Sequence, residues 1–193
     1  MQVIRYPHPV LKQACRPLKK VDAELVQIIR EMFTLMYDTN GVGLAANQVG
    51  LPYRFFVMNQ TGEAKHPEEE YVFLNPEITR GSGKPVLGEE GCLSFPKLYI
   101  EVPRAPKVTI SAYNLQGEAV KMTFTGFAAR IVQHEYDHLD GVSFFQRALP
   151  DDLETLDALD ALEKQFKEEQ ASGVIPSNEE IQKELERLIK LRA

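Results

Sequence analysis

Two histidines four residues apart are the clearest sign of chemistry in this chain. His134, Glu135 and His138 form an HExxH motif on a segment with helical periodicity. A spacing of four places both imidazoles on one face of a helix, where they can share a metal ion. Glu135 lies one residue further round, which suits a general base acting on a water bound to that metal. Because the chain has only 4 histidines, a chance match is the less favoured alternative.

A catalytic metal also needs a third protein ligand and an open position for water. An extended HExxHxxGxxH motif would require histidine at position 144, which is phenylalanine here. A peptidase of the glutamate-ligand kind could use Glu154 or Glu163. The competing candidate is Cys92, within the small-residue segment EGCLS, although a lone cysteine is as often a buried apolar residue. The residues alone leave these candidates open.

A third segment of interest is the glycine-containing stretch GVGLAANQ at residues 41–48. Its glycines permit tight backbone conformations and the close approach of a ligand. No Gly-Lys-Ser/Thr tail follows, so the segment is not a phosphate-binding loop. Taken by itself, it is most simply a turn that follows the first helix.

The elements that must position these segments alternate between helical and extended periodicity. A helix is expected from Asp22, a potential N-cap, to Asn40, where Gly41 stops the apolar repeat. Further helices are expected from Phe127 to Gly141, beyond Pro150, and from Ser177, which forms a capping box with Glu180. Strands are expected at 55–58, 71–74 and 99–102, and an antiparallel hairpin at 107–113 and 119–125.

This pattern predicts an α+β fold in which antiparallel β-sheets surround a central helix that carries the HExxH motif. A length of 193 residues suits one domain with a sizeable core. We expect the catalytic domain to occupy residues 1–150 and a helical C-terminal extension to occupy residues 151–193.

Composition and charge narrow the function classes. A formal net charge of -6 argues against a general polyanion binder, so no sequence-specific nucleic-acid binding is expected. No apolar run approaches the roughly 18 residues needed to cross a bilayer, and the first residues lack a leader pattern. These features predict a cytoplasmic protein without a membrane partner, in which Cys15 and Cys92 are reduced. The oligomeric state is not determined by the sequence.

Taken together, the three segments resemble the motifs of the peptide deformylase family, GxGLAAxQ, EGCLS and QHExDH. They read GVGLAANQ at 41–48, EGCLS at 90–94 and QHEYDH at 133–138. The resemblance covers roughly residues 1–150. It implies an amidohydrolase that releases formate from the formylmethionine at the start of nascent polypeptides.

The resemblance also implies a role for each motif residue. Cys92, His134 and His138 would be the metal ligands, with a fourth position left for water or hydroxide. Glu135 would take a proton from that water and later deliver it to the leaving amine. Oxyanion donors would be the side-chain amide of Gln48 and the backbone N–H of Leu93.

The predicted substrate site lies beside these residues. Residues three, four and seven positions before His134 share its helix face and could wall a pocket for the methionine side chain. Arg130 is the unusual member, which either points outward or forms a polar rim. Glu90 is also a candidate for an ion pair with Arg104 that fixes the cysteine loop. The full predicted set is Val42, Gly43, Glu90, Gly91, Phe127, Arg130 and Ile131.

The expected cofactor is one divalent metal ion, ferrous iron by resemblance, with zinc, nickel or cobalt able to substitute. The expected partners are N-formylmethionyl peptides, with a transient ribosome association that the family implies. An acidic stretch at 151–169 is poorly suited to RNA, so we expect the extension to pack on its own domain or on a second copy. The alternatives are an HExxH metallopeptidase with a downstream glutamate ligand and a non-catalytic metal- or peptide-binding module.

Overall fold

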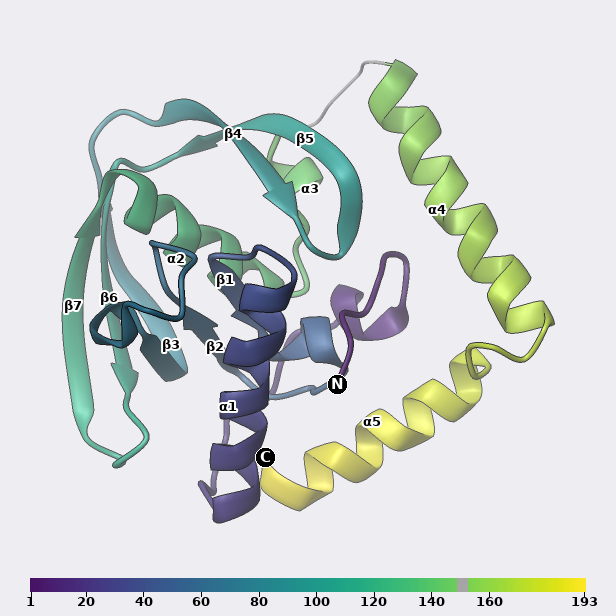
Figure 1. Cartoon of the computed structure of the whole chain (residues 1–193), viewed down its shortest axis with the longest axis horizontal. Helices are drawn as coiled ribbons and strands as arrows, with labels where there is room; N and C mark the ends of the chain where they lie inside the picture. Colours follow the sequence, from purple (N-terminus) through teal and green to yellow (C-terminus); the bar gives the residue numbers. More distant parts are fainter. Residues whose placement is uncertain (149–152) are drawn as a thin grey trace.

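A five-stranded antiparallel sheet and a separate β-hairpin form the scaffold of the protein (Figure 1). The computed structural model describes residues 1–148 and 153–193, so the predicted domain boundary at Pro150 lies outside the described residues. The large sheet has the order β1-β2-β3-β6-β7, and the hairpin pairs β4 with β5. The strands are β1 (Gly43–Ala45), β2 (Phe55–Met58), β3 (Tyr71–Ser82), β4 (Val86–Cys92), β5 (Phe95–Arg104), β6 (Lys107–Tyr113) and β7 (Ala119–Thr125).

Five α-helices and three short 3-10 turns complete the described part of the chain. The helices are α1 (Ala23–Asp38), α2 (Gly126–Leu139), α3 (Phe144–Ala148), α4 (Leu153–Ala171) and α5 (Asn178–Arg192). The 3-10 turns are η1 (Pro9–Lys12), η2 (Ala46–Val49) and η3 (Pro67–Glu69). Sheets and helices follow one another along the chain, and the predicted α+β class is confirmed.

Strand β2 is buried on both faces, because α1 and α2 cover opposite sides of the large sheet. Its alternating side chains divide between two cores: Phe56 and Met58 pack with α2, and Phe55 and Val57 pack with α1. Full burial of each such side chain contributes about 1.5–3 kcal/mol. The HExxH helix α2 therefore rests on a rigid sheet.

The observed limits of the strands show where sequence periodicity predicted the structure correctly. The predicted strands β2, β6 and β7 have the observed limits, and β6 pairs antiparallel with β7 as expected. Strands β3 and β5 extend further than predicted. Strand β4 was not anticipated because it contains Gly88 and Gly91 and leaves most of its side chains exposed. Strand β1 has only three residues, in the segment that sequence alone favoured as a turn.

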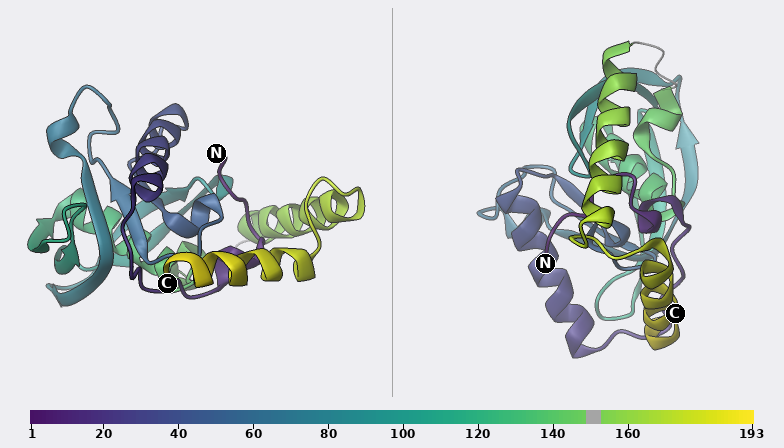
Figure 2. Two further views of the ribbon diagram at one scale, coloured as in Figure 1. Left: turned by 90° about the horizontal axis from the view of Figure 1, so that it is seen from below. Right: turned by 90° about the vertical axis from the view of Figure 1, so that its right-hand side faces the viewer.

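The C-terminal helices pack on the chain's own domain (Figure 1, Figure 2). Helix α5 begins with the predicted capping box at Ser177 and ends where Arg192 forms ion pairs with Asp22 and Glu24, at the start of α1. On α4, Leu159 and Leu162 pack against the apolar cluster around β5, whereas Leu153 and Leu156 in the first turns are exposed.

Two predictions from composition can be compared with the described residues. Cys15 and Cys92 are both free thiols, as expected, and Cys15 is buried. None of the helices described here is both long and apolar enough to span a bilayer.

His8 joins the N-terminal turn to α4. Its Nδ1 accepts a hydrogen bond from the Val10 N–H at 3.2 Å, and its ring lies edge-on to Phe166 with the centroids 6.0 Å apart. Burial lowers the pKa of His8 from 6.5 to about 4, so the folded protein favours the neutral imidazole. The stability that the fold gains from a neutral His8 is fully present above the pKa of this histidine in the unfolded chain. It is lost as pH falls through about 4, the pKa of His8 in the folded protein.

We predict that His8→Asn will reduce the acid sensitivity of the fold. Asparagine can keep the N-cap hydrogen bond but has no titrating group. The melting temperature of the variant should fall less than that of the parent between pH about 7 and pH about 4, because all other titrating groups are shared. Parallel curves of melting temperature against pH would contradict this account of His8.

Candidate metal centre and active site

Three potential metal ligands converge at the junction of the hairpin and α2. Cys92 ends β4, and His134 and His138 lie one turn apart on α2. One ligand atom from each of these residues lies within 4.8 Å of the others, and the Cys92 Sγ is 3.2 Å from the His138 Nε2. A register irregularity between Gly91 and Cys92 interrupts the β4–β5 pairing at this point. Such bulges re-aim side chains, which here brings the thiol to α2.

The chemistry of this cluster fits one divalent metal ion. A thiol with two imidazoles is a ligand set used for zinc and other first-row divalent ions. Within the described residues, the buried Glu135 Oε2 atom has no hydrogen-bond partner, which is costly for a carboxylate unless a ligand or water completes the site. The residues present therefore suit a bound ion with an adjoining water.

Glu135 is held against a backbone that has no side chain to displace it. Gly43 of β1 faces its carboxyl group, and a Cβ atom at position 43 would collide with that group. Burial raises the pKa of Glu135 from 4.5 to about 7, although the positive charge of His134 opposes the shift. A pKa near neutrality suits a group that both accepts and returns a proton.

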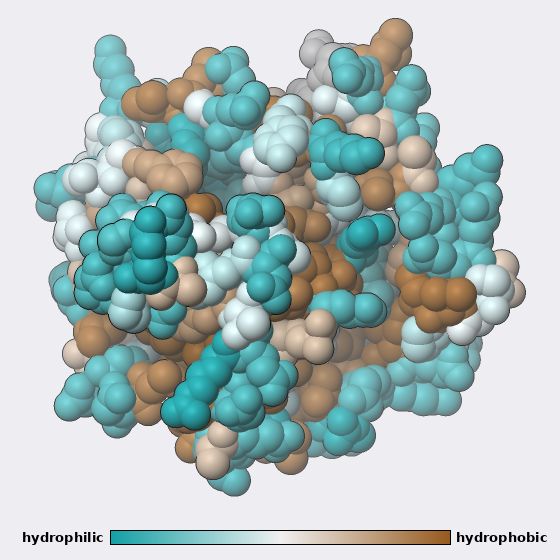
Figure 3. All heavy atoms as spheres, viewed as in Figure 1, coloured by the Kyte–Doolittle hydropathy of each residue, from teal (hydrophilic) through white to brown (hydrophobic). Residues whose placement is uncertain are grey.

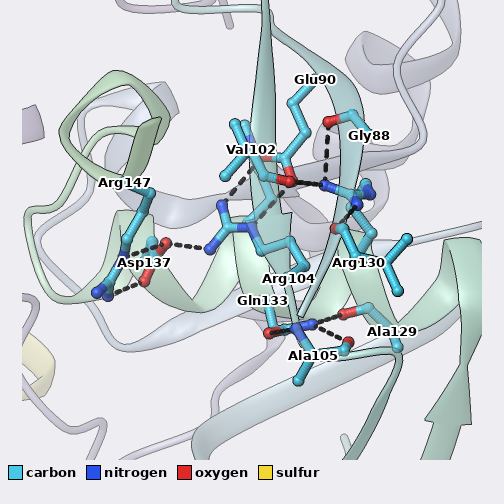
Figure 4. Close-up of polar contacts among 12 residues, drawn as sticks. Gly88, Glu90, Val102, Arg104, Ala105, Ala129, Arg130, Gln133, Asp137 and Arg147 are labelled. Carbon is cyan, nitrogen blue, oxygen red and sulfur yellow. Dashed lines mark hydrogen bonds and ion pairs between the residues drawn. The ribbon is translucent and has the colours of Figure 1, made fainter. Parts of the chain in front are cut away.

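The carboxylate of Glu90 is the centre of a buried polar network (Figure 4). Its Oε2 lies 2.9 Å from the His134 Nδ1, which leaves the opposite ring nitrogen for a metal. Arg104 donates to both carboxylate oxygens, at 2.9 and 3.0 Å, so the predicted Glu90–Arg104 ion pair is present. Burial alone would raise the pKa of Glu90, but hydrogen bonds with His134 and Arg104 lower it to about 2.

Arg130 extends the same network to the backbone of both strands of the hairpin (Figure 4). Its guanidinium donates to Glu90 at 2.8 Å and to the backbone carbonyls of Val86, Gly88 and Val102. The guanidinium thus binds the hairpin. Arg130 is therefore not a free outward side chain, and it lines the same cavity as Glu90.

Asp137 anchors the other side of Arg104. It accepts hydrogen bonds from Arg104 and from Arg147 of α3, so three elements meet at one buried carboxylate (Figure 4). Arg104 is only 6% exposed. Its guanidinium therefore joins β5 to Glu90 of β4 and to Asp137 of α2.

Gln48 and Leu93 lie beside the ligand cluster. The Gln48 Oε1 accepts the Ala45 N–H at 2.9 Å, which turns the amide NH₂ toward Cys92 and Ser94, at 3.5 and 3.3 Å. Leu93 occupies the tight turn between β4 and β5, immediately after Cys92. Both residues line the cavity in which His134 and Glu135 lie.

All of the predicted site residues except His138 line one cavity of about 1170 Å³. His138 is buried behind Cys92. Sequence reasoning did not identify Asn47, whose side-chain amide donates to the His138 carbonyl, or Ser94, which accepts from Gln48. Both lie within the three motifs, but nothing in their residue types distinguished them.

The alternative glutamate ligands lie elsewhere. Glu163 on α4 accepts a hydrogen bond from the Tyr6 hydroxyl at 2.8 Å, and Glu154 is exposed near the start of the same helix. The cluster of metal-ligating side chains found in the described residues consists of Cys92, His134 and His138. The geometry therefore gives no support to a peptidase with a downstream glutamate ligand.

Comparison with known proteins points to a single family. The family model described as polypeptide deformylase matches residues 1–154. A peptide deformylase of Rhodopirellula baltica is 44% identical over 176 residues, which cover 91% of this chain and 87% of that protein. A second, from Aquifex aeolicus, is 43% identical over 145 residues, or 75% of this chain and 85% of that one.

Solved structures agree with the sequence matches. A crystal structure of Arabidopsis thaliana peptide deformylase 1B superposes with a TM-score of 0.82 at 40% identity, covering 89% of this chain and 93% of that one. The peptide deformylase of Thermotoga maritima gives a TM-score of 0.71 at 38% identity, covering 76% and 95%. The chain therefore belongs to the polypeptide deformylase family, whose members are metal-dependent hydrolases that remove the formyl group from nascent polypeptides.

Proposed function

We propose that Cys92, His134 and His138 hold one divalent ion and that Glu135 is the general base of the deformylation reaction. The observation that carries this proposal is the meeting of three ligand atoms within 4.8 Å beside a buried carboxylate with an unpartnered oxygen. We assign catalysis to residues 1–150 and regard residues 151–193 as an added segment.

When bound, the ion acts as a Lewis acid on the formyl carbonyl and makes a water molecule more acidic. By family resemblance we propose ferrous iron, with zinc, nickel or cobalt as substitutes. The donor set itself does not discriminate among them, because thiolate and imidazole suit several first-row ions.

The chain's own residues move the proton and stabilise the developing charge. Glu135 takes a proton from a water molecule as the water oxygen attacks the formyl carbon. It returns that proton to the amide nitrogen when the C–N bond breaks. The products are formate and the free amine of the peptide. The amide NH₂ of Gln48 and the backbone N–H of Leu93 would donate to the oxyanion that forms between these steps.

The methionine side chain would enter the cavity beside α2. Ile131 is almost fully buried and Phe127 is 57% exposed, so the first forms the floor and the second the mouth of the pocket. Val42 and Gly43 form the facing wall. Glu90 and Gly91 of the hairpin and Arg130 of α2 line the same cavity, and we propose that these residues contact the peptide backbone.

We propose that the substrates are N-formylmethionyl peptides and that the protein acts in the cytoplasm, where it meets nascent chains by transient association with the ribosome. Helix α4 has six acidic and two basic residues. Such a charge balance disfavours RNA phosphates, so the ribosomal contact should use another surface.

We expect Glu135→Gln to lose about 10²- to 10⁴-fold in turnover, because it keeps the shape of the side chain but cannot accept a proton. Formate release from formyl-Met-Ala-Ser by protein loaded anaerobically with ferrous iron provides the measurement. Metal content should match that of the parent. A variant with parental turnover would refute the role of Glu135, and the absence of turnover by the folded, loaded parent would favour a non-catalytic binding module.

Glu154→Gln is the matched control for that experiment. Glu154 is exposed on α4, so its amide variant should keep both metal and turnover. Loss of the metal from this variant would instead support a peptidase-like site with a downstream glutamate ligand.

For Gln48→Ala, kcat should fall by about 10²- to 10³-fold with little change in KM, because an oxyanion donor acts in the transition state. Ser94→Ala removes a neighbour of the same amide but leaves the donor in place, so its loss should be no more than about tenfold. Steady-state kinetics on formyl-Met-Ala-Ser gives kcat and KM separately for each of these two variants. A rise in KM with unchanged kcat in Gln48→Ala would show that Gln48 only binds the ground state.

A further inference from the structure

The active-site cavity continues well past the catalytic residues. Its volume of about 1170 Å³ exceeds the roughly 300–1,000 Å³ of a typical small-molecule site, so it has room for more than formylmethionine. The space-filling view shows a hollow with apolar side chains between the catalytic part and α4 (Figure 3). His134 and Glu135 line the inner end of this same cavity.

The outer wall of the cavity comes from the C-terminal segment. It is formed by Leu162 and Phe166 of α4 and by the connection to α5, at Val174, Ile175 and Pro176. These residues lie beyond residue 154, where the match to the family model ends. Val174 is 72% exposed, so its apolar side chain is available to a ligand in this cavity.

Specific contacts fix this wall relative to the metal-binding loop. The Tyr6 hydroxyl donates to Glu163 of α4, its ring stacks on Phe95 with centroids 4.9 Å apart, and its N–H donates to the Ser94 carbonyl at 3.0 Å. Phe166 packs in a cluster with Val10, Leu11, Ile181 and Leu185. The wall is thus tied to the turn that follows Cys92.

The chemistry of the wall favours apolar ligands. The charged residues that line the cavity outside the metal-ligand network, Arg5, Lys97, Glu89 and Glu169, include both signs, so no strong net charge is offered to a peptide. Covering the exposed apolar atoms of Val174 and its neighbours with an apolar side chain of a ligand would remove them from water, which favours binding.

We propose that the C-terminal segment forms a binding site for the nascent peptide beyond its second residue, with a preference for an apolar side chain at one of positions three to five. This inference rests on the proposed function, since the peptide must start at the metal centre and leave along the same cavity. An extended chain advances about 3.3 Å per residue, so these positions lie roughly 7–13 Å beyond the methionine.

The test compares five-residue peptides of the form formyl-Met-Ala-Ser-Ser-Ser amide with versions that carry one leucine at position three, four or five. We expect leucine at one position to raise kcat/KM on the order of fivefold through a lower KM. In Val174→Ser this gain should disappear, whereas the matched exposed variant Leu153→Ser, on the same segment but outside the cavity, should retain it. Hydrolysis of formyl-Met-Ala should be equal in all three proteins.

Calorimetric binding of the same peptides to Glu135→Gln provides a readout that does not depend on turnover. Tighter binding of one leucine peptide that is lost on adding Val174→Ser would support the inference even if the parent released no formate, a result that would count against the proposed function alone. Equal affinity for all peptides, or a leucine gain that survives Val174→Ser, would overturn the inference.

Discussion

The Glu90 carboxylate holds the hairpin, α2 and the metal-ligand cluster in one arrangement. It receives hydrogen bonds from the Arg104 Nε and Nη2, the Arg130 Nη1 and the His134 Nδ1, while it is only 6% exposed. Removing one partner of such a buried ion pair typically costs about 3–5 kcal/mol, because the other charge is left without compensation. Glu90 precedes Cys92 by two residues, so the contact that orients a histidine also positions the thiol.

Burial within the fold also sets the pKa of Glu135. A carboxyl group in water has a pKa well below neutrality, whereas the pKa of Glu135 is raised to about 7 where α2 meets β1. The close approach is available because Gly43 presents no side chain to Glu135. The glycine-containing segment and the helix motif therefore act together, although Glu135 lies 92 positions after Gly43 in the sequence.

Much of the fold could be predicted from the sequence, because apolar periodicity directly records which faces of α1, α2 and β6 are covered. Strand β4 could not, since its glycines and exposed side chains serve the hairpin and not a core. The ligand histidines follow from spacing within one helix. Spacing could not identify Cys92 as their neighbour, because that contact depends on how a distant hairpin docks, and only the family motif indicated it. The hydrogen bonds of Arg130 could not be predicted either, because most of its acceptors are backbone carbonyls, which every residue type has.

The most direct test of the metal centre is the absorption spectrum of protein loaded with one equivalent of cobalt(II). If Cys92, His134 and His138 bind the ion, the parent will show a thiolate-to-cobalt charge-transfer band. That band will be absent from Cys92→Ser and retained in Cys15→Ser, whose thiol is buried away from the cluster. A charge-transfer band that survives in Cys92→Ser, or a parent spectrum without thiolate character, would contradict this account of the site.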